Sequence, residues 1–242
     1  SDVDVDRYVI DGQLTQVMVS ARELDENNIP GGGWVNEKLV YTHGFGSVVS
    51  PANSVTAEGQ PSFLVQDIPP VSATADLATV QDRIYFGDAA SGSFSIVGSK
   101  QDEVDFPISE EGNDVAFTSY DGAGGVELGG IFRRLAFALR FADLDTLISG
   151  QLTADSKVLM ERNVVERVKR LAPILYPDSE PYLILTDDGR MVWMVDMYTI
   201  NDNYPYSEAA NTGRLNRASS LPSSFNLSQT RARVSEGRVR SS

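Results

Sequence analysis

The only histidine in the chain, His43, is the side chain best suited to acid–base chemistry near neutral pH. It stands at the end of an expected short helix over residues 34–42. One interpretation is a hydrolase in which His43 works with a nearby carboxylate, such as Asp67 or Asp196. The alternative is a structural histidine that binds the last carbonyl groups of that helix. Both interpretations stay open at this point, and so does the question of whether the chain is an enzyme.

A glycine-rich segment, residues 121–125, suggests a second kind of site. It precedes a helical pattern that carries Arg133 and Arg134, and glycine-rich entries to helix N-termini bind anions through backbone N–H groups. We therefore consider Gly124, Arg133 and Arg134 as an anion-binding or sugar-binding site. The segment lacks the Lys-Ser/Thr ending of a P-loop and the glycine spacing of a dinucleotide fingerprint. Glycines that serve only a tight turn and close helix packing explain the pattern equally well.

Composition narrows the possible chemistry. The chain of 242 residues has one histidine and no cysteine, which excludes two-histidine zinc motifs, thiolate metal sites and cysteine nucleophiles. Its acidic clusters lack the spaced oxygen ligands of a calcium loop, so we expect no metal and no cofactor. The formal net charge of −14 argues against a broad nucleic-acid surface, which depends on clustered Lys and Arg. We therefore expect no nucleic-acid partner.

The longest helical pattern lies in the stretch from Ser119 to Ile148, where a helix is expected over residues 126–142, and residues 143–148 either extend it or turn out of it. Most of the shorter elements are expected to pack on this helix. Apolar residues recur along it at helical spacing, which predicts a broad apolar stripe that shorter elements must cover. The residues of this stripe are Leu128, Ile131, Phe132, Leu135, Leu139 and Ala142. We therefore expect this helix to lie at the centre of the fold.

Other patterns supply the elements around this helix. A second helix is predicted over residues 164–172, with Asn163 as its N-cap. Apolar runs at 182–186 and 191–195 are joined by Asp-Asp-Gly, which predicts a hairpin with a type I′ turn. Another hairpin is expected over residues 83–97. Together these elements predict an α+β fold in which a mixed, mostly antiparallel sheet packs against two or three helices.

Residues 1–213 are expected to form a single soluble α+β domain, since the chain is long enough and, at 41% hydrophobic residues, apolar enough for a core. Its apolar runs are much shorter than the roughly 20 residues of a membrane-spanning helix. Residues 214–242 are different, because they contain six arginines, a single acidic residue and many serines. We expect this basic tail to be disordered or non-homologous.

Short strings spread in order from Ala21 to Asn216 carry a resemblance to a known family. They are Ala21-Arg-Glu-Leu-Asp25, Trp34-Val-Asn36, Leu39-Val-Tyr-Thr-His-Gly44, Ser50-Pro51 with Asn53, Asp67-Ile-Pro-Pro70, Ile84-Tyr-Phe-Gly87, Arg133-Arg-Leu-Ala-Phe-Ala-Leu-Arg-Phe141, Glu166-Arg-Val168, Pro181-Tyr182, Asp188-Gly-Arg190 and Tyr204-Pro-Tyr-Ser207. As a set they resemble the uncharacterised protein family 0182, whose members are prokaryotic multi-pass membrane proteins with a large soluble region.

The resemblance implies a location rather than a chemistry. It implies that this chain is the extracytoplasmic, soluble portion of a cell-membrane protein, joined to the membrane through segments outside this sequence. It brings no activity, cofactor or catalytic residue, although His43 lies inside one matching string. The leading hypothesis is therefore a binding or structural module of the cell envelope, with a hydrolase or an anion- or sugar-binding domain as alternatives. After Asn216 the sequence departs from the continuation expected for the family.

Overall fold

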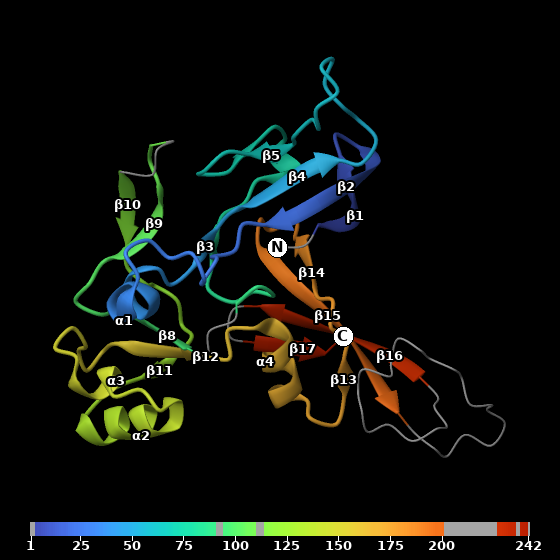
Figure 1. The fold of residues 1–242 in the computed structure, drawn as a ribbon. Helices are drawn as coiled ribbons and strands as arrows, with labels where there is room; N and C mark the ends of the chain where they lie inside the picture. The colour runs from blue at the N-terminus through green and yellow to red at the C-terminus, as the bar shows by residue number, and fades with distance from the viewer. Residues whose placement is uncertain (1–2, 91–93, 110–113, 201–226, 236–237, 242) are drawn as a thin grey trace, which may run out of the picture.

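The computed structural model describes residues 3–90, 94–109, 114–200, 227–235 and 238–241 (Figure 1). Within these residues the chain forms several small sheets, and the largest one near the N-terminus has five strands in the order β1-β2-β4-β5-β6. These strands are β1 (Asp4–Ile10), β2 (Gln13–Ala21), β4 (Ser47–Pro51), β5 (Val65–Gln66) and β6 (Val71–Ser72). Alternate residues of β2, namely Val17, Val19 and Ala21, are buried, as expected for a strand with one face on a core.

A second sheet is built around β15 (Met191–Ile200), which pairs with β13, β14 and β16. The other strands of this sheet are β13 (Tyr176–Pro177), β14 (Tyr182–Leu185), β16 (Leu227–Ser235) and β17 (Arg238–Ser241). The predicted hairpin is confirmed as β14 and β15. Its turn is not type I′, because that turn needs two residues with positive φ and only Gly189 has one here, at 73°.

Part of the tail that was expected to be disordered is described as strands. Residues 227–235 form β16 and pair with β15, and β17 pairs with β16 in turn. Pairing of β16 satisfies the backbone groups along one edge of β15, an edge that would otherwise stay open. Residues 214–226 lie outside the described part of the chain.

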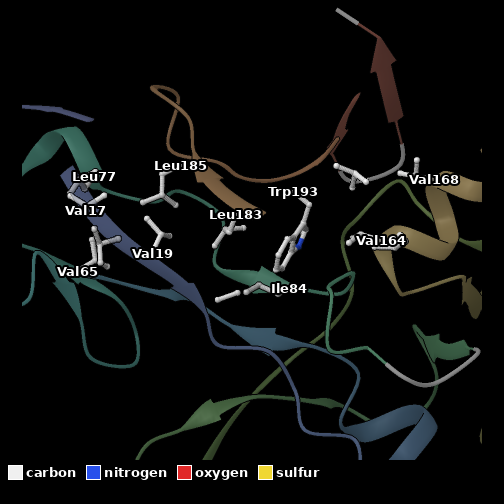
Figure 2. Close-up of a cluster of buried hydrophobic side chains, with 14 of the residues drawn as sticks. Val17, Val19, Val65, Leu77, Ile84, Val164, Val168, Leu183, Leu185 and Trp193 are labelled. Carbon is white, nitrogen blue, oxygen red and sulfur yellow. The ribbon is translucent and has the colours of Figure 1, made fainter. Parts of the chain in front are cut away.

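The two large sheets share one hydrophobic core with helix α4 (Val164–Leu171) (Figure 2). In Figure 2 the buried side chains extend from Val17 and Val65, past Leu183, to Trp193 and then to Val164. The helix begins where the sequence predicts it, because the Asn163 side chain accepts hydrogen bonds from the N–H groups of the second and third helical residues, at 3.0 and 3.1 Å. This core, rather than the long central helix, unites the N-terminal and C-terminal parts of the chain.

Strand β1 also covers the outer edge of β14 with side chains. The Asp4 carboxylate accepts a hydrogen bond from Leu183 N at 2.9 Å, and the Tyr8 hydroxyl accepts one from Leu185 N at 2.8 Å. Burial raises the pKa of the Tyr8 hydroxyl. The backbone donors of this edge are therefore satisfied without another strand.

A smaller unit lies at the other end of the molecule, where a three-stranded sheet has the order β11-β12-β8 (Figure 1). Its strands are β8 (Phe94–Val97), β11 (Val126–Glu127) and β12 (Lys157–Met160). Two strand pairs lie beside this sheet. They are β3 (Gly44–Phe45) with β7 (Arg83–Ile84), and β9 (Glu103–Pro107) with β10 (Val115–Thr118). The hairpin expected over residues 83–97 is wrong, because β7 pairs with β3 and β8 pairs with β12.

The remaining helical elements are short. They are α1 (Gly33–Val35), η1 (Asn36–Val40), η2 (Ala75–Leu77), α2 (Ile131–Phe141) and α3 (Asp145–Ile148). The first two correspond to the helix expected over residues 34–42, and Leu39 of η1 is fully buried against β8 and β12.

The helix expected over residues 126–142 is confirmed only in part, as α2, and it does not lie at the centre of the fold, so the expected role of the segment Ser119 to Ile148 is wrong. The segment contains β11 and the two separate helices α2 and α3, because Ala142 adopts a left-handed conformation (φ 53°) that ends α2. Helix α2 packs through Phe137, Ala138 and Phe141, not through the expected stripe. Of that stripe, Leu128 is buried outside the helix, while the side chains at 131, 132, 135 and 139 are exposed.

The predicted α+β class with mostly antiparallel strands is confirmed in outline. The predicted arrangement, a single sheet packed on two or three helices, is not observed. The helices are few, and the strands form several small, separate sheets. Every ladder between named strands in the described residues is antiparallel, and parallel pairing is confined to isolated bridges such as Gln81 with Arg190.

Candidate functional site: a cationic cleft beside a buried polar network

A cleft lies where β7 meets β15 and α4, and its charged side chains are three arginines. Arg83 comes from β7, Arg167 from α4, and Arg190 from the turn before β15. Two contacts connect the segment around β7 with β15 and the turn before it. The indole N–H of Trp193 donates to the Phe86 carbonyl at 2.9 Å, and Arg190 forms a parallel bridge with Gln81. The remaining wall of the cleft is apolar and aromatic: Ile84, Tyr85, Phe86, Leu183, Met191, Val192 and Trp193.

The cleft continues into a neighbouring hollow. The two share Gln81, Arg83, Tyr85 and Arg190 as lining residues. The far side of the hollow is formed by Tyr120, Asp121 and Gly122, together with Phe45, Val80 and Asp82. Residues of the glycine-rich segment 121–125 therefore border the groove formed by the cleft and the hollow together. They do so from a loop, and not as the predicted anion-binding entry to a helix.

The three arginines differ in how far their charge is balanced. Arg83 makes a two-pronged ion pair with Asp105, at 2.7 and 2.8 Å, so its charge is largely neutralised. Arg190 is paired with Asp188 at 3.2 Å on the exposed rim, where such a pair is weak.

Arg167 has no ion pair with any described residue. Its guanidinium lies over the Phe86 ring, 4.4 Å from the centroid, and donates one hydrogen bond to the Met160 carbonyl at 3.3 Å. Burial lowers the pKa of Arg167, which is the effect of partial dehydration on a cation. A guanidinium carries five N–H donors, so several remain for a ligand in the cleft.

Behind the cleft lies a buried carboxyl group, Glu103, that is only 2% exposed. It accepts hydrogen bonds from the Thr42 hydroxyl, from the Tyr85 hydroxyl at 3.2 Å, and from Tyr120 N at 3.2 Å. Burial raises the pKa of Glu103, and these hydrogen bonds oppose the shift. Glu103 thus fixes the positions of Tyr85 and Tyr120, the two rings that line the groove.

A buried arginine, Arg162, joins the same network from the other side. Its guanidinium donates to the Tyr85 carbonyl (3.0 Å), the Thr42 carbonyl (2.7 Å), the Ser95 hydroxyl (2.6 Å) and the Glu26 carboxylate (2.8 Å). Arg162 is 3% exposed, so it is out of reach of a ligand. It holds together segments that are far apart in the sequence.

His43 belongs to this buried network and not to the surface of the cleft. Its side chain is 0% exposed. Its Nδ1 lies 3.1 Å from the Gly44 carbonyl, so Nδ1 carries the proton, and the ring packs on Tyr85 at a centroid distance of 4.7 Å. The Nε2 atom is 3.8 Å from Asp105 and has no hydrogen-bond partner among the described residues.

The hydrolase interpretation does not fit this geometry. The carboxylate that faces His43 is that of Asp105, which is already engaged by Arg83. Asp67 lies on the exposed turn between β5 and β6, and Asp196 lies within β15. A buried ring bonded to backbone cannot activate water in the cleft, so the structural interpretation of His43 is the one that the structure supports.

Burial lowers the pKa of His43 to about 4, with a nearby carbonyl and Asp105 opposing the shift and Arg83 and Arg162 adding to it. As the pH falls below about 6.5, the unfolded chain takes up a proton that the folded chain refuses, so stability is lost. We expect the unfolding free energy of the wild type to fall by roughly 2 to 3 kcal/mol more than that of His43→Gln between pH 7 and pH 4.5.

Chemical denaturation at the two pH values measures this difference. Because His43 is the only histidine, its ring signals in an NMR titration also report its protonation directly. Burial raises the pKa of Glu23 to about 6, so protonation of this carboxyl group stabilises the folded protein as the pH falls, opposite to the effect of His43. Both proteins in the comparison contain Glu23, so its contribution cancels. Equal pH slopes for the two proteins would contradict the expectation.

The predicted anion site does not assemble. Gly124 precedes β11, while α2 begins only at Ile131, so the glycine segment is not its N-terminal loop. The Gly124 carbonyl accepts a bond from the Tyr120 hydroxyl at 3.2 Å. Arg134 donates to the Leu152 carbonyl at 2.8 Å, and Arg133 to the Glu127 carbonyl at 3.4 Å. The arginines that line a cleft are therefore different ones.

Sequence reasoning missed Arg83, Arg167 and Arg190 as a group because they are spread along the chain, although Arg167 and Arg190 lie inside two of the strings that carry the family resemblance. Arg190 also follows the turn of the predicted hairpin, but no local signal places the three side chains together. Among the described residues no group of three or more His, Cys, Asp or Glu side chains is placed to hold a metal ion.

Comparison with known families agrees with the resemblance seen in the short strings. A family model described as "Uncharacterised protein family (UPF0182)" matches residues 1–227. The chain belongs to this family. UPF0182 proteins from Moorella thermoacetica, Pelotomaculum thermopropionicum and Methanospirillum hungatei are 46%, 43% and 42% identical to it, over 89%, 87% and 90% of the chain.

The chain spans only a part of these UPF0182 relatives, namely 23%, 22% and 24% of their lengths in the same order. No solved structure matches it. None of the helices in the described part of the chain combines the length and the hydropathy that a bilayer crossing requires. The family name carries no activity, so a function has to be argued from the cleft.

Proposed function

We propose that this chain is the extracytoplasmic binding module of a larger UPF0182 membrane protein, and that its cleft binds an anionic ligand. The observation that carries the proposal is Arg167, a half-buried guanidinium in the wall of a cleft that forms no ion pair with any described residue and donates one hydrogen bond to a carbonyl there. Two further arginines face the same cleft, in a chain whose net charge is −14. An anion there gains charge-assisted hydrogen bonds that water alone does not provide.

The shape of the cleft favours a particular class of anion. Its wall is apolar and aromatic through Phe86 and Trp193, while Tyr120 and Asp121 border the adjoining hollow. Such a site suits a carboxylate or phosphate attached to a ring or an apolar group, such as an acidic sugar. The acidic group would lie against Arg167 and Arg190, and the rest of the ligand would lie along the groove.

The membrane part of the proposal has separate support. The sequence resembles a family of multi-pass membrane proteins, and the relatives are long enough to contain spanning segments outside the matched region. Added protease should reach this part of the full-length protein in intact cells. Complete protection there, with cleavage after lysis, would overturn the extracytoplasmic location.

The anion site is tested by calorimetric titration of the 242-residue chain with glucuronate, inorganic phosphate and uncharged glucose. Glucuronate or phosphate should bind, and glucose should bind at least tenfold more weakly, because loss of one charge-assisted contact costs about 1.5 to 3 kcal/mol. Arg167→Gln should weaken anion binding by about tenfold or more.

Arg170→Gln is the matched control. Arg170 lies one turn further along the same helix, is 60% exposed, and is not among the residues that line the cleft. It removes the same charge from the protein as a whole, so any long-range effect of net charge is reproduced. Equal weakening by both substitutions, or failure of the wild type to bind either anion, would overturn the proposed site.

A further inference from the structure

The exposed face of helices α2 and α3 is apolar to a degree that their surroundings do not explain. Ile131 (61% exposed), Phe132 (85%), Leu135 (43%) and Leu139 (75%) share one side of α2 by helical spacing, and Leu144 (73%) and Ile148 (74%) are exposed at the two ends of the short helix that follows. Single exposed apolar residues are ordinary, but a contiguous group on one face marks an interaction surface. We call these six residues the α2–α3 face.

The α2–α3 face is separate from the side of α2 that packs on the domain. Ile131, Phe132, Leu135 and Leu139 project from one sector of the helix. Phe137 and Phe141 project from another sector and pack on the core, and Ala138 of that sector is buried. Phe141 stacks on Phe94 at a centroid distance of 4.2 Å, so the inner face is firmly seated. The exposed side chains are therefore additional to the apolar side chains with which α2 packs on the domain.

The charges of α2 complete the surface. The helix has three arginines and no acidic residue, in contrast with the acidic chain as a whole. Arg133 and Arg140 are seven residues apart and lie in a third sector of the helix, both exposed. Among the acids, Asp143 accepts from the Trp34 indole N–H and Glu161 pairs with Arg140 at 3.4 Å, while Glu127 and Asp145 are exposed. Arg133 forms no ion pair with any described residue, and its guanidinium donates to the Glu127 carbonyl.

We propose that the α2–α3 face docks on the surface of an anionic lipid bilayer. A helix with bulky apolar residues on one side and arginines at its flank lies in the membrane interface, with the apolar side chains between acyl chains and the cations at the headgroups. The charge pattern favours lipid over a second copy of this chain, because two copies would bring their arginines together. In Figure 1, α2 lies at the outer end of the smaller unit, where a flat surface can approach it.

The test is flotation of the 242-residue chain with vesicles of phosphatidylcholine, alone or containing about one third phosphatidylglycerol. We expect binding to the anionic vesicles and about tenfold or more weaker binding to the neutral ones. Replacing Phe132 and Leu139 together by Ser should reduce binding about tenfold or more, and Arg133→Gln with Arg140→Gln about tenfold.

Ile174→Ser is the matched control, because Ile174 is 83% exposed but does not belong to the α2–α3 face. Folding of each variant is checked by circular dichroism, and exposed positions were chosen so that it should not change. Arg167→Gln should bind vesicles like the wild type, which separates this proposal from the anion cleft. Absence of flotation with anionic vesicles, or self-association in sedimentation that the Phe132 and Leu139 substitutions abolish, would overturn lipid docking.

Discussion

Replacing Arg162 by Leu should strongly destabilise the fold, with a loss of about 3 to 5 kcal/mol in the free energy of unfolding. The substitution removes the buried cation that pairs with the Glu26 carboxylate, and it removes donors from the carbonyl groups of Thr42 and Tyr85. Buried acceptors that lose their donors retain the full cost of dehydration. Since whole domains are stable by only about 5 to 15 kcal/mol, this single change removes a large fraction.

Denaturant titration followed by circular dichroism measures the loss. Arg162→Lys should also destabilise the protein by about 2 kcal/mol or more, because one ammonium group cannot reproduce the spread of donors of a guanidinium. Arg170→Leu, at an exposed position, should change stability by less than about 0.5 kcal/mol. A loss below about 1 kcal/mol for Arg162→Leu would mean that the network does not hold the fold together.

Gly44→Ala should have an effect of similar size for a steric reason. A Cβ atom at this position would lie 2.3 Å from the Arg22 carbonyl oxygen, 2.7 Å from Glu23 Cα and 2.9 Å from Leu24 N. These are backbone atoms, so no side chain can rotate away. The two segments would have to separate, and we expect a loss of about 3 kcal/mol or more.

Gly150→Ala provides the comparison, because nothing lies within 4 Å of a Cβ at that position and its φ is not positive. It should leave the denaturation midpoint almost unchanged. If Gly44→Ala proved as stable as Gly150→Ala, the close approach of residues 22–24 to residue 44 would not exist in solution.

Local structure was predictable where its signals are local. The Asn163 cap lies two and three residues from the N–H groups that it binds, and the β14–β15 hairpin is defined by an Asp-Gly turn between two apolar runs. Even there the turn type was wrong, since the Asp-Asp-Gly loop places a single residue at positive φ. The class of fold followed from these elements, but the division into several small sheets did not.

The buried network was not predictable, because its contacts connect distant parts of the chain. Arg162 is 120 residues from Thr42 and 136 from Glu26, and Glu103 is 61 from Thr42. Nothing in the local sequence marks an arginine or a glutamate as buried, since both residue types are usually exposed. The position of His43 depends on the same contacts, which is why its structural role and its catalytic role were equally compatible with the sequence.

Helix α2 shows the opposite kind of error. Its apolar periodicity is genuine, but periodicity identifies a face without saying what covers it. The residues expected to face the core face outward, while Phe137 and Phe141 pack on the small core that includes β8 and β12. A helix with two apolar sectors can pack on the core with either one, and the sequence pattern alone does not show which sector is buried.

The side chains of Asp4 and Tyr8 along β14 have a practical consequence for anyone who shortens this protein. A version that begins after residue 8 would leave the N–H groups of Leu183 and Leu185 facing water on an apolar strand. Such an edge recruits strands from other molecules, so the shortened protein should assemble into oligomers or precipitate at concentrations where the longer one remains dispersed.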